Sequence, residues 1–105
     1  MKFTVEETLK RLPLPATDKW KDGVWDLEPF EKRGVRLVFF APRGVDYQTA
    51  HDVDEFYFIA RGSGELLIGD ERHACTAGDA FCVPAAVNHR FENFSDDFAT
   101  WAIFF

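Results

Sequence analysis

The sequence predicts a single all-β domain, a small barrel or jelly roll of short strands with one short helix at its N-terminus. The chain has 105 residues, which is the size of one domain. Turn-forming Gly, Pro and Asp residues recur every eight to twelve residues along most of it. The runs between these turns are rich in β-branched and aromatic residues, which favour strands. We find no repeat or linker that would indicate a second domain.

The first residues predict a short helix. Thr4 and Glu7 have the spacing of a capping box, in which each side chain bonds the backbone N–H of the other residue. Apolar residues then recur at helical spacing as far as Leu12, where two prolines interrupt the pattern. Since so short a helix does not persist alone, we expect residues 1–16 to form a helix and docking segment and residues 17–105 to form the barrel.

Eight strands fit between the turn signals. They are Val24–Phe30, Val35–Phe40, Glu55–Ala60, Glu65–Ile68, His73–Thr76, Ala80–Val83, His89–Phe94 and Phe98–Phe104. Some of them are apolar on both faces, since Phe56 and Phe58 alternate with Tyr57 and Ile59. A barrel buries only its inward face, so the outward aromatic residues require a second layer, either the N-terminal segment or another subunit. We therefore expect a homodimer; a compressed sandwich that hides both faces is the alternative.

Composition limits the partners. Acidic residues outnumber basic ones by 18 to 12, and a net charge of −6 disfavours nucleic acid. No apolar run approaches the roughly 20 residues of a membrane span. The acidic N-terminus does not resemble a signal peptide, so we expect a cytoplasmic protein. Cys75 and Cys82 are too few for a disulfide scaffold and are expected to be buried free thiols rather than a redox pair.

Glu55 is the most informative single residue. Strand alternation places it on one face with Tyr57, directed toward the interior, where a carboxylate requires a cation or several donors. His51 precedes it by four residues, and His89 begins a later strand. Two imidazoles and one carboxylate suit Zn, Fe, Mn, Ni or Cu. From spacing alone, each histidine is equally an ordinary loop or strand residue, and Glu55 equally a solvated strand end or the partner of an arginine.

Two sets of residues have the spacings of a known motif pair. The first set is Gly44, Thr49, His51, Glu55 and Gly62. The second set is Gly78, Pro84, Ala86, His89 and Asn93. Together they resemble the two motifs of the cupin superfamily, in its small single-domain form with a cupin 2 conserved barrel. The resemblance implies a β-barrel of six or more strands, with a metal held by two His and one Glu of the first motif and one His of the second.

The sequence departs from that pattern at two positions. The ligands that the resemblance still implies are His51, Glu55 and His89. Thr49 stands where the family has the leading histidine, so one ligand is lost, and water or Gln48 would fill its place, with Tyr57 as a further pocket residue. Ala86 replaces the glycine of the second motif. We therefore expect a turn that needs no positive φ at this position.

Three functions are consistent with these features. The first is a small metal-binding cupin that acts on a small organic acid or a sugar-like molecule, as a dioxygenase, isomerase or decarboxylase. The second is a non-catalytic module that binds a small molecule, with or without a metal. The third is a structural dimer whose barrel is filled with Phe side chains, in which Glu55 pairs with a protonated His89.

Overall fold

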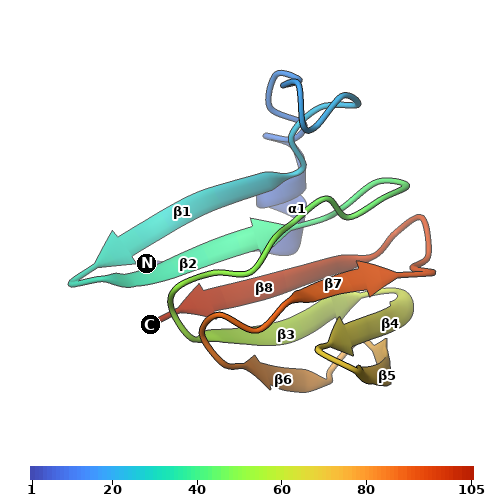
Figure 1. Ribbon diagram of the computed structural model, residues 1–105. Coiled ribbons are helices and arrows are strands. Elements are labelled where there is room, and N and C mark those ends of the chain that lie inside the picture. Colours follow the sequence, from blue (N-terminus) through green and yellow to red (C-terminus); the bar gives the residue numbers. More distant parts are fainter.

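The computed structural model describes residues 1–105 and contains one short helix and eight strands, which confirms the all-β class. The helix α1 spans Val5–Leu9. The strands are β1 Asp26–Lys32, β2 Val35–Phe40, β3 Glu55–Arg61, β4 Ser63–Ile68, β5 Glu71–Thr76, β6 Ala80–Val83, β7 His89–Glu92 and β8 Ala99–Phe104 (Figure 1). All eight predicted strands are present, with ends that differ by a few residues. No helix has the length and apolar character of a membrane span.

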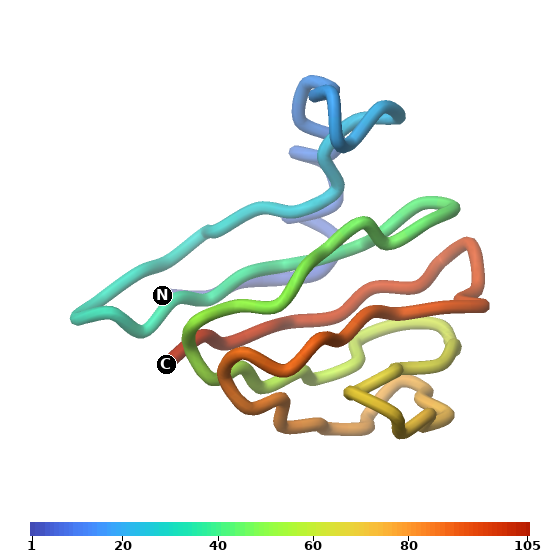
Figure 2. The backbone as a smooth tube through the Cα atoms, in the orientation of Figure 1, coloured from blue at the N-terminus to red at the C-terminus, as the bar shows by residue number.

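The strands form two antiparallel sheets that pack against each other. The larger sheet has the order β1-β2-β8-β3-β6, and the smaller has the order β5-β4-β7. The chain crosses between the sheets four times, from β3 to β4, from β5 to β6, from β6 to β7 and from β7 to β8 (Figure 2). The main core lies between the sheets and includes Phe40, Tyr57 and Ile59 from the larger sheet and Leu66 and Phe91 from the smaller one.

Alternation along β3 places its only acidic residue inside. Glu55, Tyr57 and Ile59 are buried, whereas Phe56 and Phe58 are exposed. Successive side chains of a strand point to opposite faces, so Glu55 is directed toward the interior together with Tyr57, as the sequence predicts.

The N-terminal segment covers part of the outer face of the larger sheet. Phe39 of β2 and Trp101 of β8 are in contact there, with ring centroids 4.8 Å apart. Like Trp101, the apolar residues Val5, Leu9 and Leu12 pack against the buried cluster that contains Phe39. One half of the predicted capping box is present, since the Glu7 amide donates to Thr4 Oγ1 at 3.1 Å. The outward aromatic residues of β2 and β8 thus obtain the second layer that they require.

A second group of outward aromatic residues has no cover within the chain. Phe56 stacks on Phe58 and on Phe105, with ring centroids 6.1 and 5.2 Å apart. We call Phe56, Phe58 and Phe105 the outer phenylalanine patch. Cys82 lies opposite Phe56 on the edge strand β6 and is exposed, so the expectation that both thiols are buried is wrong for Cys82, because its side chain faces outward. Cys75 is buried in the core, and both thiols are free.

Candidate metal centre

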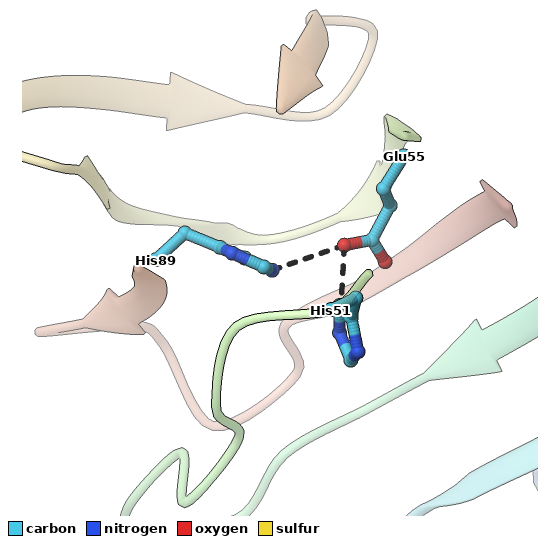
Figure 3. A group of neighbouring side chains, drawn as sticks. All are labelled: His51, Glu55 and His89. Atoms are coloured by element: carbon cyan, nitrogen blue, oxygen red, sulfur yellow. Dashed lines mark hydrogen bonds and ion pairs between the residues drawn. The ribbon is translucent and has the colours of Figure 1, made fainter. Parts of the chain in front are cut away.

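Two histidines and one glutamate from separate segments converge inside the barrel. Glu55 is the first residue of β3, His51 lies in the segment before it, and His89 is the first residue of β7 in the other sheet (Figure 3). Their ligating atoms all lie within 4.8 Å of one another. Glu55 Oε1 is 3.0 Å from His89 Nε2 and 3.8 Å from His51 Nε2. The structure therefore brings together the three residues singled out in the sequence.

The spacing and chemistry of these atoms fit a divalent metal ion. Metal–ligand bonds of about 2 Å place neighbouring ligand atoms roughly 3–3.5 Å apart in tetrahedral geometry. The two distances from Glu55 Oε1 bracket this range. Two imidazole nitrogens and one carboxylate oxygen form a donor set that Zn, Fe, Mn and Ni accept, and such a set leaves positions open for water or a ligand.

Burial makes the pairing of these groups necessary. Glu55 and His89 are only 2% and 5% exposed, whereas His51 is half-buried. An isolated buried carboxylate costs several kcal/mol, and the only charged partners within ion-pair distance of Glu55 are the two histidines. Glu55 therefore does not face solvent and does not pair with an arginine.

A backbone contact orients His89. Its Nδ1 lies 2.9 Å from the carbonyl oxygen of Val87, which can only accept, so Nδ1 carries the proton. In the neutral ring Nε2 then has a free lone pair directed at the centre, which is the donor that a metal requires. In the protonated ring the same nitrogen donates to Glu55.

The two histidines have opposite pKa shifts. Burial lowers the pKa of His51, and the nearby Glu55 carboxylate offsets this only in part. Burial also lowers the pKa of His89, but hydrogen bonds to Glu55 and to the Val87 carbonyl outweigh it and leave this pKa above its ordinary value. In the absence of a metal, His51 is therefore the more readily neutral of the two rings, and His89 is the more readily protonated.

The turn before β7 holds the segment that carries His51. The amide of Ala86 donates to the His51 carbonyl at 2.6 Å, and the amide of Ala85 donates to Asp54 Oδ1 at 2.8 Å. Ala86 has φ of +65°, so the expectation that this turn needs no positive φ is wrong. The turn keeps the geometry for which the family motif has a glycine. Ala86 therefore adopts a left-handed conformation, which glycine adopts more readily than alanine.

A buried acid orders the residues next to the centre. Asp46 accepts hydrogen bonds from the Phe91 amide at 2.8 Å, from the Gln48 amide at 2.9 Å and from Gln48 Nε2 at 2.5 Å. Gln48 Oε1 accepts from the Tyr57 hydroxyl at 3.0 Å. Both ends of the Gln48 side chain are thus engaged. Gln48 and Tyr57 were expected here from the sequence, whereas Asp46 was not; its only signal was its place in the first motif, between Gly44 and His51.

Two hollows lie beside the centre. The first has a volume of about 260 Å³, and the second of about 350 Å³. His51 and Glu55 line the first, whereas His89 lines the second. Gln48 and Thr49 line both. We call the first the sheet cavity, because its other lining residues lie mainly on β1, β2 and β8.

The sheet cavity combines an apolar wall with charged groups. Val38, Phe40, Ala102 and Phe104 are among its apolar lining residues. Its charged lining residues outside the centre are Lys19, Asp26, Glu28 and Arg36. Arg36 forms an ion pair with Glu28, and its guanidinium lies over the Phe104 ring, 5.0 Å from the centroid. Lys19 forms no ion pair and lies 5.9 Å from the centroid of the Trp20 ring.

The fold and the site together define a jelly-roll barrel with an internal His/Glu/His cluster. Residues 36–105 match the Cupin domain family, and the chain belongs to that family. The predicted resemblance is thereby confirmed. The chain is also 34% identical over 93 residues to an uncharacterized protein of Streptomyces coelicolor, which covers 87% of this chain and 88% of that protein.

Solved structures agree on the fold. A cupin-2 domain protein from Shewanella frigidimarina has a TM-score of 0.70 at 14% identity, over 96% of this chain and 91% of that chain. KdgF from a Halomonas species has a TM-score of 0.66 at 20% identity, over 75% and 76% of the two chains. A cupin 2 conserved barrel protein from Salinispora arenicola has a TM-score of 0.64 at 20% identity, over 76% and 73%. At these identities, the likeness establishes the barrel and not the activity.

Proposed function

We propose that His51, Glu55 and His89 bind a divalent metal ion, one of Zn, Fe, Mn or Ni, and that a small organic acid or sugar-like molecule binds at the open positions. The observation that carries this proposal is the convergence of the three donor atoms within 4.8 Å at the wall of a cavity. The missing fourth ligand, at Thr49, leaves one more position for water or for the bound molecule.

The residues around the centre have distinct tasks in this proposal. The Val87 carbonyl holds the ring of His89, and the Ala86 amide holds the backbone of His51. A bound metal would polarise a carbonyl or carboxylate oxygen of the ligand. The apolar wall excludes water from the remainder of the ligand. Dioxygenase, isomerase and decarboxylase chemistry all fit such a site.

Charge favours an acid as the ligand. Outside the centre, the cavity lining carries two cations, Lys19 and Arg36, and two acids, Asp26 and Glu28, so these charges balance. A divalent metal ion with Glu55 as its only anionic ligand then adds a net positive charge. A carboxylate is therefore attracted into the sheet cavity, whereas a neutral analogue is not.

Metal content tests the proposal directly. The protein is purified without a histidine tag and analysed for bound metals, together with Glu55→Gln, His89→Gln and the control His73→Gln. His73 lies outside the cluster, on β5. We expect about one metal ion per chain in the wild type and the control, and loss of the ion in the two centre variants with the fold retained by circular dichroism. Metal-free wild type that stays metal-free after incubation with each of the four ions would refute the proposal.

The alternative function is a metal-free binding module. The hydrogen bond of 3.0 Å between His89 and Glu55 favours it, because this bond satisfies both buried groups without an ion. Ligand-observed NMR tests this function with lactate, which is an acid, and with lactamide, its neutral analogue. We expect lactate to bind the metal-free protein more weakly after Lys19→Ala and unchanged after the control Lys21→Ala, which lies outside the sheet cavity.

We also propose that the outer phenylalanine patch is the interface of a homodimer. Phe56, Phe58 and Phe105 are 38%, 44% and 48% exposed and form a continuous stack. Light scattering coupled to size exclusion should show a dimer that Phe58→Asp converts to a monomer. The control Val35→Asp, at an exposed apolar residue of β2, should leave the dimer intact. A monomeric wild type would refute the dimer.

The two free thiols support a location in a reducing compartment, and we propose that the protein is cytoplasmic. Fractionation of the native source with an antibody to the protein tests this. Recovery outside the cytoplasmic fraction would refute it.

A further inference from the structure

We propose that Asp26 is a catalytic residue of the sheet cavity, where it transfers protons to and from a ligand held at the centre. This inference rests on the proposed metal and ligand binding. No motif of the sequence points to Asp26, and the family resemblance assigns it no role.

The register of β1 directs Asp26 into the cavity. Asp26 pairs with Phe40 of β2, and directly paired residues of antiparallel strands share a face. Phe40 is buried in the main core, so the shared face is the inner one. Asp26 lines the same cavity as His51 and Glu55 of the centre.

Asp26 differs from the other inward acids in having no partner. Glu28 pairs with Arg36, Asp46 accepts three hydrogen bonds, and Glu55 bonds His89. No hydrogen bond or ion pair from the chain reaches the Asp26 carboxyl group. A half-buried carboxylate without partners has its hydrogen-bonding capacity available for a ligand.

Burial alone raises the pKa of Asp26 above its ordinary value, because desolvation disfavours the charged form. The charged and titratable groups that line the cavity with it are Lys19, Glu28, Arg36, His51, Glu55 and Tyr57. A carboxyl group whose pKa is raised toward neutrality is the better proton-transfer group. The position and the missing partner establish the candidate, and the pKa direction agrees with it.

The size of the cavity makes the contact feasible. Its volume of about 260 Å³ lies below the range of roughly 300–1,000 Å³ for pockets that hold drug-sized ligands. A cavity of this size keeps a bound ligand close to its lining, which includes His51, Glu55 and Asp26.

The proposed step is a reversible proton transfer. With a 2-oxo acid, the C–H bond next to the carbonyl breaks and an O–H bond forms on the Asp26 carboxylate. The electron pair of the C–H bond stays on the ligand and is shared with its carbonyl oxygen. The proton then returns from Asp26 to the same or a neighbouring atom, so that no oxidant or reductant is consumed.

The first test follows the titration of Asp26 in the metal-free protein. Carbon NMR of protein labelled at the aspartate carboxyl carbons is recorded from pH 3 to 8 for wild type, Asp26→Asn and the control Asp70→Asn. Asp70 lies exposed in the turn between β4 and β5. We expect the signal lost in Asp26→Asn to titrate above pH 4, the ordinary range of aspartate. A midpoint at or below the ordinary value overturns the inference, whatever the metal content is.

The second test measures proton transfer itself. Zinc-loaded protein is incubated with pyruvate in D₂O, and deuterium entering the methyl group is followed by proton NMR. We expect exchange above that of free zinc, a loss of at least about 100-fold in Asp26→Asn, and no loss in Asp70→Asn. Zinc content is measured in every sample.

The two proposals fail in different ways. Wild type that binds none of Zn, Fe, Mn and Ni overturns the proposed metal centre and the role of Asp26 with it; where it binds another of these ions and not zinc, that ion replaces zinc in the second test. Zinc-loaded wild type that shows no protein-dependent exchange, or a zinc-loaded Asp26→Asn that exchanges as fast as wild type, overturns the role of Asp26 alone.

Discussion

Replacing Ala86 with glycine should stabilise the protein. Ala86 has φ of +65°, and the left-handed conformation costs a residue with a Cβ about 1–2 kcal/mol. Glycine adopts this conformation without that cost, but it increases the entropy of the unfolded chain by about 0.4–1 kcal/mol. The difference predicts a gain of about 0.5–1 kcal/mol in the free energy of unfolding for Ala86→Gly.

Urea denaturation of the metal-free protein measures this gain. With a slope of about 1–3 kcal/mol per molar urea, the midpoint should rise by roughly 0.2–1 M. Ala85→Gly is the matched control, since Ala85 is the adjacent alanine, is not at positive φ, and also donates its amide hydrogen bond. There the same chemical change should lower the free energy of unfolding by about 0.5–1 kcal/mol.

The opposite signs of these two effects make the test decisive. If Ala86→Gly lowers the midpoint as Ala85→Gly does, the left-handed conformation of Ala86 is wrong. The reasoning that links this turn to the glycine of the family motif would then fail as well. Metal content should be the same in both variants, because both keep the backbone amides that hold His51 and Asp54.

Three further outcomes are expected. Thr49→His restores the missing donor and should raise the affinity for the metal at least about tenfold, or 1.4 kcal/mol. Competition with a chelator measures this affinity, and an unchanged value would place residue 49 too far from the ion. In the metal-free protein, the pKa of His89 is higher in the folded than in the unfolded chain, so its protonation stabilises the fold. This stability is fully present below the pKa of histidine in the unfolded chain, about 6.5, and is lost as the pH rises through the pKa of His89 in the folded protein. The free energy of unfolding should therefore fall from about pH 6.5 to 8 and, in Glu55→Gln, fall less; an equal slope in both would contradict the pairing. Burial raises the pKa of Cys75 to about 11, so iodoacetamide at pH 8 should leave Cys75 unmodified in the native protein and react with it after unfolding. Mass spectrometry detects the modification, and rapid modification of the native protein would contradict this expectation.

The strands could be predicted from the sequence because local signals determine them. Turn residues separate the eight strands, and alternation in Glu55–Arg61 predicts which side chains point inward. The order of the strands was not predictable, because alternation says which residues share a face and not which strands are neighbours. The pairing of β8 with both β2 and β3 connects residues far apart in the chain. The division of the chain after residue 16 stays a prediction.

The centre was predictable in part. Spacing alone left His51, Glu55 and His89 as ordinary residues, and the motif resemblance raised them to candidates. Asp46 was missed because its place in the motif does not reveal that it accepts a hydrogen bond from the amide of Phe91, which is distant in the chain. Asp26 was missed for a different reason: an isolated acid near a strand end is usually solvated, and only the register with β2 directs it inward.

The three residues of the centre differ in how far solvent reaches them. The His51 side chain is 32% exposed, against 3% for Glu55 and 1% for His89. An ion or a ligand therefore meets the imidazole of His51 first, on the side of the sheet cavity that His51 lines. A bulky substituent beside this ring would consequently close the centre without touching the two buried residues.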